Sequence, residues 1–326
     1  MKAVLCEAHG PAENLVIRDL PEPEAGFGEV VVDVAAIGLN FFDTLIIRDR
    51  YQVKPDLPFS PGGEFAGHVR AVGPGVTEWA VGDRVAGYLS FGAARERLVV
   101  PAESLARVPD GLDFVKAAGL TVTYGTGLYA LRDRGGLQPG ETLVVLGAAG
   151  GVGLAAVELG KALGARVIAC ASSAEKLAFA KAHGADEGID YTTENFKGRL
   201  KALGGEAGID MVFDPVGGDL SEVAVRALNS GGRLMVIGFA AGDIPKLPLN
   251  LLLLKNCDAR GVAFGTKCRT DPAWCRAAME DLMGHALSGR LSGHVDATFP
   301  LERCAEALAE ISQRRVKGKV VLTAGA

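Results

Sequence analysis

The strongest chemical signal is a glycine-rich segment, Gly147-Ala148-Ala149-Gly150-Gly151-Val152-Gly153, which directly follows the apolar run 142–146. The next ten residues read as a helix, so a predicted strand enters a tight turn and then a helix. Gly150 lets the backbone approach a pyrophosphate, and Gly153 lets the helix pack close to the strand. Ala148 departs from the usual motif, which has a glycine there. A tight turn without a ligand is the alternative, but the following strand at βαβ spacing favours dinucleotide binding.

The end of the next predicted strand distinguishes between two cofactors. An NAD site places an acidic residue there to bind the ribose 2′-hydroxyl. This chain instead has Ser172 and Ser173, with Lys176 one short turn later. Hydroxyls and an ammonium group suit a 2′-phosphate, whereas a carboxylate would repel it. The serines could equally cap the following helix, and both roles are compatible; Glu175 is the one residue against this reading. NADPH is the favoured cofactor.

Composition narrows the classes of function. The 326 residues carry 34 basic and 39 acidic side chains, a net charge of −5 that argues against a nucleic-acid partner. We expect no membrane span, since no uncharged window approaches the ~20 apolar residues that a helix needs. The six cysteines are dispersed without a C-x2-C pair, which argues against a disulfide framework and a structural zinc site. We therefore expect a cytoplasmic protein.

The sequence around the glycine-rich turn shows two kinds of secondary-structure pattern. The first hundred residues contain short β-branched runs separated by Gly and Pro turns, which predicts a β-rich domain. From about residue 113, strands and helices alternate at βαβ spacing, which predicts a parallel, doubly wound sheet. The expected strands there are 142–146, 166–169, 211–214 and 233–237, and the expected helices are 152–163, 174–183 and 220–228. Later patterns predict helices over 273–287 and 301–313 and a final strand over 319–323.

Three further motifs accompany the glycine-rich turn in a fixed order: Asn40-Phe41-Phe42-Asp43, Pro61-Gly62-Gly63-Glu64-Phe65-Ala66-Gly67 and Val76-x3-Ala80-Val81-Gly82-Asp83-Arg84-Val85. Together they resemble the medium-chain dehydrogenase/reductase superfamily, and within it the zinc-free quinone oxidoreductase (zeta-crystallin-like) branch. The resemblance spans nearly the whole chain. It implies an α/β fold with a GroES-like, β-rich catalytic domain from residues 1–122 and 265–326. A Rossmann dinucleotide-binding domain would occupy residues 123–264.

Zinc is not expected. Zinc-dependent members of the superfamily have a cysteine after the Ile37-Gly38 position and a Gly-His-Glu in the next motif, where this chain has Leu39-Asn40 and Gly63-Glu64. His68 has no cysteine nearby and reads as a strand residue. Without a metal, hydride transfer requires an acceptor conjugated to a carbonyl, so that negative charge can spread onto oxygen.

The resemblance implies which residues form the site. Asn40, Asp43 and Tyr51 would surround the acceptor, although a turn-stabilising Asn40, a locally structural Asp43 and an exposed Tyr51 remain alternatives. Lys317 or Lys319, from a basic cluster that would ordinarily be a solvated helix end, could contact a cofactor phosphate, and Phe239 and Phe264 could be core residues. The expected cofactor contacts are Thr126, Ala149, Gly150, Gly151, Val152, Ser172, Ser173, Lys176, Tyr191, Gly217, Ile237, Gly238, Phe239, Ala240, Val262, Ala263, Phe264 and Lys317.

The predicted activity is NADPH-dependent reduction of a quinone or small enone. An enoyl thioester (acyl-CoA) reductase is the alternative, hinted at by Arg48, Arg50 and Lys54. A non-catalytic NADPH-binding protein, crystallin-like or RNA-binding, is the alternative from another class. The apolar run 247–254 would form a helix that needs cover on most sides. A large exposed apolar patch there would mark an interface, and we expect a homodimer.

Overall fold

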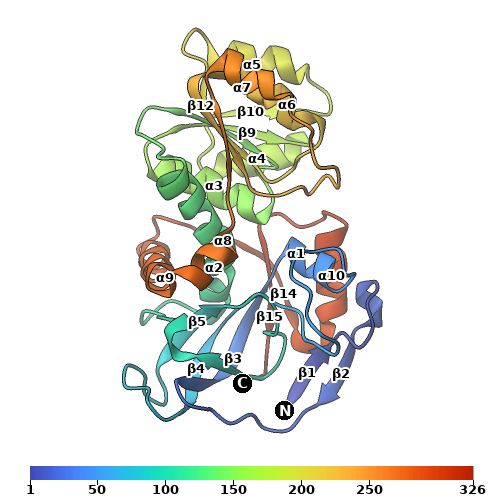
Figure 1. The fold of residues 1–326 in the computed structure, drawn as a ribbon, viewed down its shortest axis with the longest axis vertical. Coiled ribbons are helices and arrows are strands. Elements are labelled where there is room, and N and C mark those ends of the chain that lie inside the picture. Colours follow the sequence, from blue (N-terminus) through green and yellow to red (C-terminus); the bar gives the residue numbers. More distant parts are fainter. Residues whose placement is uncertain (326) are drawn as a thin grey trace. The chain divides into compact units, whose positions relative to one another are not determined.

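The computed structural model describes residues 1–325, which divide into two compact units. Unit 1 contains Met1–Gly125 together with the chain from Phe264 onward, and unit 2 is Thr126–Ala263. The sequence had placed these divisions at 122/123 and 264/265. Both chain ends lie in unit 1, so unit 2 is an insertion within it (Figure 1).

Unit 1 is built around a mainly antiparallel sheet with the order β14-β15-β3-β4-β5-β7, in which β6 also pairs with β3. Its long central strand is rich in valine, and side chains on both of its faces are buried. A separate hairpin joins β1 and β2. The strands are β1 (Lys2–Leu5), β2 (Val16–Asp19), β3 (Glu29–Leu39), β4 (Glu64–Val72), β5 (Arg84–Tyr88), β6 (Arg97–Pro101), β7 (Leu105–Arg107), β14 (Val295–Pro300) and β15 (Lys319–Thr323).

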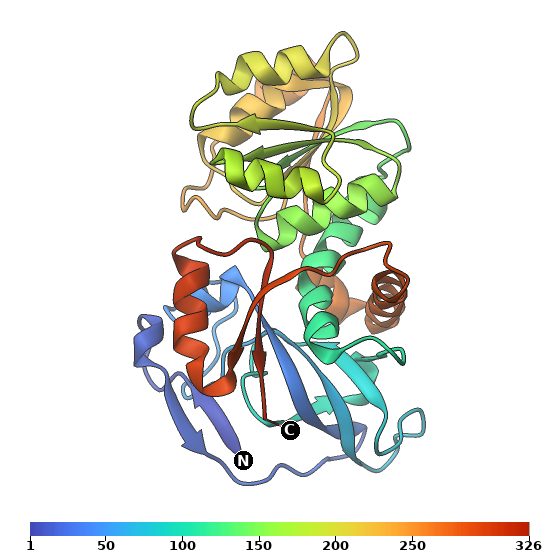
Figure 2. The ribbon, with the colours of Figure 1, turned by 180° about the vertical axis from the view of Figure 1, so that it is seen from behind.

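The C-terminal segment completes unit 1. β15 pairs antiparallel with the end of β3, so residues 36–39 lie opposite residues 320–323. Figure 2 shows this segment and its helix beside the N-terminal strands. Apolar residues from both parts of the chain, including Ile37, Phe65 and Leu322, share one core. The helices of unit 1 are α1 (Phe41–Ile46), α2 (Phe114–Leu128, which continues into unit 2), α8 (Phe264–Thr270), α9 (Pro272–Leu287) and α10 (Cys304–Ser312).

Unit 2 is a parallel six-stranded sheet with the order β10-β9-β8-β11-β12-β13. Numbered along the chain this is the order 3-2-1-4-5-6 of dinucleotide-binding folds. Helices lie on both faces of the sheet (Figure 2), which leaves the central strands fully buried. The elements are β8 (Thr142–Leu146), α3 (Gly151–Ala162), β9 (Arg166–Ala171), α4 (Ala174–Ala182), β10 (Glu187–Asp190), α5 (Phe196–Gly204), β11 (Ile209–Asp214), α6 (Asp219–Ala227), β12 (Leu228–Val236), α7 (Leu249–Lys255) and β13 (Asp258–Gly261).

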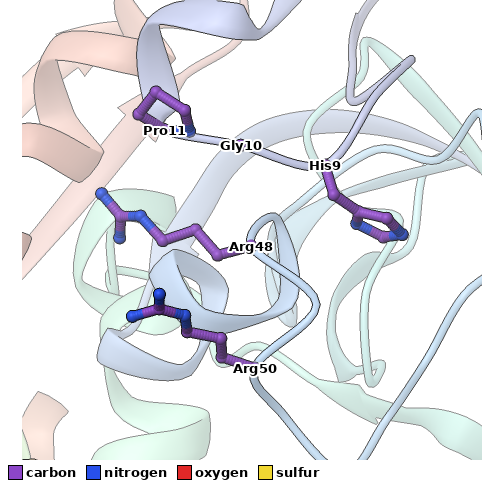
Figure 3. A pocket seen from close by; sticks show the side chains of 5 residues that line it. All are labelled: His9, Gly10, Pro11, Arg48 and Arg50. Carbon is purple, nitrogen blue, oxygen red and sulfur yellow. The ribbon is translucent and has the colours of Figure 1, made fainter.

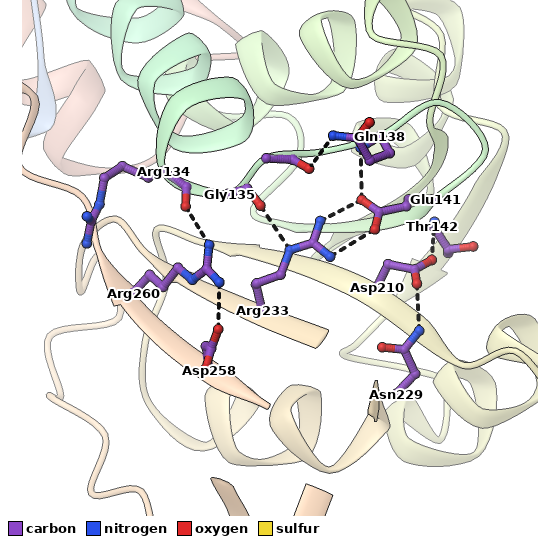
Figure 4. Close-up of polar contacts among 11 residues, drawn as sticks. Arg134, Gly135, Gln138, Glu141, Thr142, Asp210, Asn229, Arg233, Asp258 and Arg260 are labelled. Carbon is purple, nitrogen blue, oxygen red and sulfur yellow. Dashed lines mark hydrogen bonds and ion pairs between the residues drawn. The ribbon is translucent and has the colours of Figure 1, made fainter. Parts of the chain in front are cut away.

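A polar network closes the amino-terminal edge of this sheet (Figure 4). Arg233 of β12 donates both terminal nitrogens to the carboxylate of Glu141, at 2.9 and 2.5 Å, and its Nε to the carbonyl oxygen of Gly135. Asp210 accepts from the backbone N–H of Thr142 at 2.7 Å. These contacts satisfy the backbone N–H at the start of β8 and the carbonyl oxygen of Gly135. The opposite, carboxyl-terminal edge is therefore the one available for a ligand.

The predicted fold class is confirmed, and the differences concern short elements. Strands β10 and β13 have four residues each, and helix α1 has six, so none spans enough residues to show a clear period. The expectation that helix 247–254 is covered on most sides is wrong for this single chain. Leu249, Leu253 and Leu254 of α7 are 77%, 81% and 75% exposed, and only Leu251 is buried.

The sequence argued against a disulfide framework, and the structure contains one disulfide. Cys268, near the end of α8, forms a disulfide with Cys275 in the first turn of α9. The chain turns sharply between the two helices at Asp271, the N-cap of α9. This turn brings the two sulfur atoms together although seven positions separate the cysteines. Spacing alone did not reveal the pair because the turn creates the proximity. Cys6, Cys170, Cys257 and Cys304 are buried free thiols. The cytoplasmic location remains a prediction, and the cysteines no longer support it.

No helix within residues 1–325 has the length and apolar character that crossing a bilayer requires.

Candidate functional site

The glycine-rich turn between β8 and α3 has the close packing that a nucleotide-binding loop needs. Gly147 takes a left-handed backbone (φ 62°), so the tight turn is made one residue before the buried Ala148. A Cβ atom at Gly153 would collide with the carbonyl oxygen of Gly147. The helix can therefore approach the strand only with glycine at this position. Its first N–H groups, from Gly151 onward, lack carbonyl partners within the helix and can bind phosphate.

Ser172, Ser173 and Lys176 lie together after the carboxyl end of β9. Ser173 caps α4, because its hydroxyl accepts from the backbone N–H of Lys176 at 3.3 Å. The Lys176 ammonium group reaches back to the Ser172 hydroxyl at 3.4 Å. The capping role is thus present, and the ammonium group stands on the same side as both hydroxyls. All three side chains are half-buried, which leaves them accessible to a ligand.

A residue that the sequence analysis missed, Asp214, organises the end of β11. Its Oδ1 accepts from the backbone N–H groups of Val216 and Gly217, both at 2.9 Å, and its Oδ2 accepts from the Ser221 hydroxyl. This carboxylate holds Gly217 in a left-handed conformation (φ 75°) against Phe239. An Asp three residues before a Gly-Gly pair is the signal that could have identified it.

The other predicted cofactor residues divide into two groups. Tyr191, the segment 237–240 and Val262 each follow the carboxyl end of a strand, and their backbones bond to neighbouring strand ends. The sheet therefore brings them to the same edge as the glycine-rich turn. Of the remaining four, Thr126 is buried in α2, and Ala263 follows Val262 as the last residue of unit 2. The other two belong to unit 1, where Phe264 packs its ring edge-on against Tyr88 and Trp274 and Lys317 donates its backbone N–H to Asp296.

In unit 1, the predicted acceptor residue Asn40 belongs to a buried polar network. Lys319 donates its ammonium group to Asn40 Oδ1 at 2.6 Å and to the Glu64 carboxylate. Asn40 Nδ2 donates to Glu64 Oε1 at 2.8 Å, and the backbone N–H of Val122 donates to Glu64 Oε2 at 2.6 Å. Glu64 is fully buried, and Asn40 and Lys319 are 8% and 4% exposed.

This network fixes the direction of the Asn40 amide. Its oxygen faces an ammonium group and its nitrogen faces a carboxylate, so a flipped amide would meet like partners on both sides. One N–H of the amide is used by Glu64, and one is left to donate. The prediction that Lys319 could contact a cofactor phosphate is wrong, because its ammonium group is already engaged with Glu64 and Asn40. The sequence could not show this contact because residues 64 and 319 are 255 positions apart.

Asp43, the second predicted acceptor residue, is completely buried at the first turn of α1. Its carboxylate accepts from the backbone N–H of Asn40 at 2.7 Å and of Gly62 at 2.9 Å. Burial raises the pKa of Asp43 to about 7, although these two donors and the nearby Lys319 oppose the rise. The side chain thus ties the start of α1 to the loop before β4, which is the local structural role that the sequence left open.

Two tyrosines lie near this carboxylate. The ring of Tyr51 stacks on Phe42 with centroids 5.6 Å apart, so it is half-buried rather than an exposed loop residue. Burial raises the pKa of Tyr51, and it raises the pKa of Tyr88 to about 12. Both phenols therefore stay protonated at neutral pH and can donate a hydrogen bond. The sequence analysis did not single out Tyr88, which β5 places opposite Glu64.

The residues that would hold zinc in metal-dependent relatives do not form a ligand set here. Asn40 and Glu64 bond to each other and to Lys319, and a cation side chain already neutralises the carboxylate. His68 is an exposed residue of β4 whose ring meets Phe114 edge-on, as expected for a strand histidine. Across residues 1–325, no three His, Cys, Asp or Glu side chains are grouped to bind a metal ion.

Fold and site together define a two-domain dehydrogenase. Residues 26–110 match the alcohol dehydrogenase GroES-like domain family, and residues 151–281 match the family described as zinc-binding dehydrogenase. The second description is a family name, and the residues present show no such metal site.

Similar proteins narrow the class. The chain is 39% identical over 325 residues to quinone oxidoreductase-like protein 2 homolog of Nematostella vectensis, covering 98% of this chain and 88% of that protein. It is 38% identical over 324 residues to quinone oxidoreductase of Pseudomonas aeruginosa, covering 98% and 99%. The structure of Escherichia coli quinone oxidoreductase complexed with NADPH matches with a TM-score of 0.93, 29% identity, and coverage of 99% and 100%. The chain therefore belongs to the quinone oxidoreductase-like branch of the medium-chain dehydrogenase/reductase superfamily.

The titration of Asp43 gives a testable pH dependence. Because folding raises the pKa of this carboxyl from about 4 to about 7, the folded chain binds the proton more tightly than the unfolded chain. The stability that Asp43 contributes is full below about pH 4 and is lost as the pH rises to 7. The free energy of unfolding of the wild type, minus that of Asp43→Asn, should fall by more than about 1 kcal/mol between pH 5 and pH 8. Urea unfolding at both pH values measures this, and a constant difference would contradict it.

Proposed function

We propose that this protein is an NADPH-dependent oxidoreductase that reduces a quinone or another α,β-unsaturated carbonyl compound. The observation that carries the proposal is the fixed Asn40 amide, whose oxygen is held by Lys319 and whose remaining hydrogen can only donate. A donor of this kind suits a carbonyl oxygen on which negative charge develops.

The cofactor assignment rests on unit 2. The close contact at Gly153 and the free N–H groups at the start of α3 fit a pyrophosphate. The hydroxyls of Ser172 and Ser173, with the Lys176 ammonium group, fit a 2′-phosphate, and Glu175 in the first turn of α4 is the one carboxylate of this segment that opposes it. The Escherichia coli relative with the same fold is complexed with NADPH. When bound, this cofactor supplies the hydride.

The acceptor chemistry follows from unit 1. Hydride addition to a conjugated carbon moves an electron pair onto the carbonyl oxygen. The free N–H of Asn40 would stabilise that oxygen, and Tyr51 and Tyr88 remain protonated donors at neutral pH. The product oxygen takes its proton from one of these phenols or from water. The enzyme contributes orientation and charge stabilisation, as expected where no metal polarises the carbonyl.

The activity is tested by NADPH oxidation at 340 nm with 1,4-benzoquinone, 9,10-phenanthrenequinone, an alkyl enone and crotonyl-CoA, each with and without EDTA. We expect turnover of at least one of these conjugated acceptors, at a rate that EDTA does not change. Binding of NADPH without turnover of any acceptor would instead favour the non-catalytic nucleotide-binding alternative.

Within this test, Asn40→Ala should lower kcat for the acceptor about a hundredfold, because it removes the donor to the developing charge. The KM for NADPH should not change. Asn195→Ala is the matched control, since Asn195 also caps a helix but lies in α5. Equal losses of activity in both variants would contradict the role of Asn40.

The 2′-phosphate assignment predicts a change of cofactor preference. Lys176→Ala removes a charge-assisted contact and should lower kcat/KM for NADPH about tenfold, while kcat/KM for NADH stays unchanged. Lys181→Ala, an exposed lysine on the same helix, is the control. Steady-state kinetics with both cofactors measure the ratio, and a parallel loss with NADH would refute the assignment.

We also propose a homodimer. The exposed leucines of α7 lie in the segment just before β13, which forms the unpaired edge of the sheet in unit 2. Leu253→Lys places a charge on this apolar face and should shift the protein to monomers, whereas Val81→Lys, at an exposed apolar position of unit 1, should not. Sedimentation velocity distinguishes the two species, and a dimer that survives Leu253→Lys would show that this face is not the interface.

A further inference from the structure

A cavity of about 320 Å³ in unit 1 is lined by two arginines that the proposed site does not use. Its walls are formed by His9, Gly10, Pro11, Arg48 and Arg50 (Figure 3). The guanidinium groups of Arg48 and Arg50 extend to the same side, whereas the His9 ring turns away and packs near Phe59. The cavity thus presents two cations beside an apolar Pro11 wall.

The two charges are not neutralised by the protein. Arg48 donates to the carbonyl oxygen of Thr44 at 2.9 Å, which fixes its side chain, but within residues 1–325 neither arginine pairs with a carboxylate. The carboxylate of Asp49, which separates them in sequence, is bound by the Lys54 ammonium group. Asp49 and Lys54 therefore cancel, and the cavity retains a charge of about +2 from its arginines.

Two guanidinium groups that share a cavity suit a phosphate, because each offers paired N–H donors in one plane. The same short segment carries the residues proposed to hold the acceptor. Asn40 begins α1, Arg48 and Arg50 follow its end, and Tyr51 comes next. A six-residue helix is about 9 Å long. The flexible arm between a thioester and its phosphates can cover such a length.

We propose that Arg48 and Arg50 bind the phosphate groups of the acceptor, and that the acceptor is an α,β-unsaturated thioester of coenzyme A. This inference rests on the proposed function, because it names the substrate class of the same reduction. The hydride adds to the β-carbon, the electron pair moves through the α-carbon to the thioester oxygen, and the α-carbon then takes a proton from water. An uncharged quinone would leave the arginines unused.

Binding is tested first, because it does not depend on turnover. Titration calorimetry compares coenzyme A, pantetheine, which has the same arm without phosphates, and inorganic phosphate. We expect coenzyme A to bind at least about tenfold more tightly than pantetheine, and Arg48→Gln/Arg50→Gln to abolish the difference. Equal binding of coenzyme A and pantetheine would overturn the inference. Inorganic phosphate that binds as tightly as coenzyme A would assign the cavity to a free anion and would also overturn it.

Kinetics then compare crotonyl-CoA with crotonyl-pantetheine, with NADPH as the reductant. The wild type should show a kcat/KM at least about tenfold higher for crotonyl-CoA, and the double variant should treat both alike. Equal values in the wild type, or a preference that survives in the variant, would overturn the inference. Turnover of quinones but of neither thioester would overturn it and leave the proposed function intact. Loss of turnover with every acceptor would refute the proposed function, and calorimetry would still decide on the cavity.

The variants need three controls. Arg50→Gln alone keeps the Arg48 contact to Thr44, so it should weaken coenzyme A binding without affecting folding. Arg70→Gln, at an exposed arginine of β4, should change neither measurement. The KM for NADPH should be the same in the wild type and the double variant. A parallel rise in that KM would show that the arginines serve the cofactor and would overturn the inference.

Discussion

The buried ion pair between Lys319 and Glu64 is the constraint on which unit 1 depends. Removing either partner would leave an uncompensated charge in the interior, which costs several kcal/mol. The Asn40 amide and the backbone N–H of Val122 in α2 also donate to Glu64. The elements β15, β4, α1 and α2 must therefore meet at one point. The position of the Asn40 amide is thereby set by segments from both ends of the chain. A side chain held in this way needs no reorganisation when charge develops beside it.

The candidate sites of the two units are built by different means. Unit 2 relies on backbone geometry: glycines allow close approach at Gly147 and Gly153, and a carboxylate, Asp214, fixes the turn around Gly217. Unit 1 relies on side chains in a buried polar network. The backbone solution produces a short sequence motif, because the glycines must be close together along the chain. The side-chain solution leaves only scattered residues.

This difference explains what the sequence could predict. The strands 142–146 and 319–323 agree with β8 and β15, since each is a continuous apolar run with clear ends. The contact between Lys319 and Glu64 had no local signal, and a lysine in a basic cluster reads as solvated until the fold buries it. The exposure of α7 and the pairing of Cys268 with Cys275 likewise depend on tertiary neighbours.

The insertion of unit 2 within unit 1 has a consequence for synthesis on the ribosome. Every strand of the parallel sheet has been made by Gly261, so unit 2 can fold while the chain is still growing. Unit 1 cannot, because β3 lacks its neighbour β15, and Glu64 lacks its cation, until residues 319–323 have been made. Until then, the edge of β3 that pairs with β15 stays open. Unit 2 can therefore form before unit 1 has all of its strands.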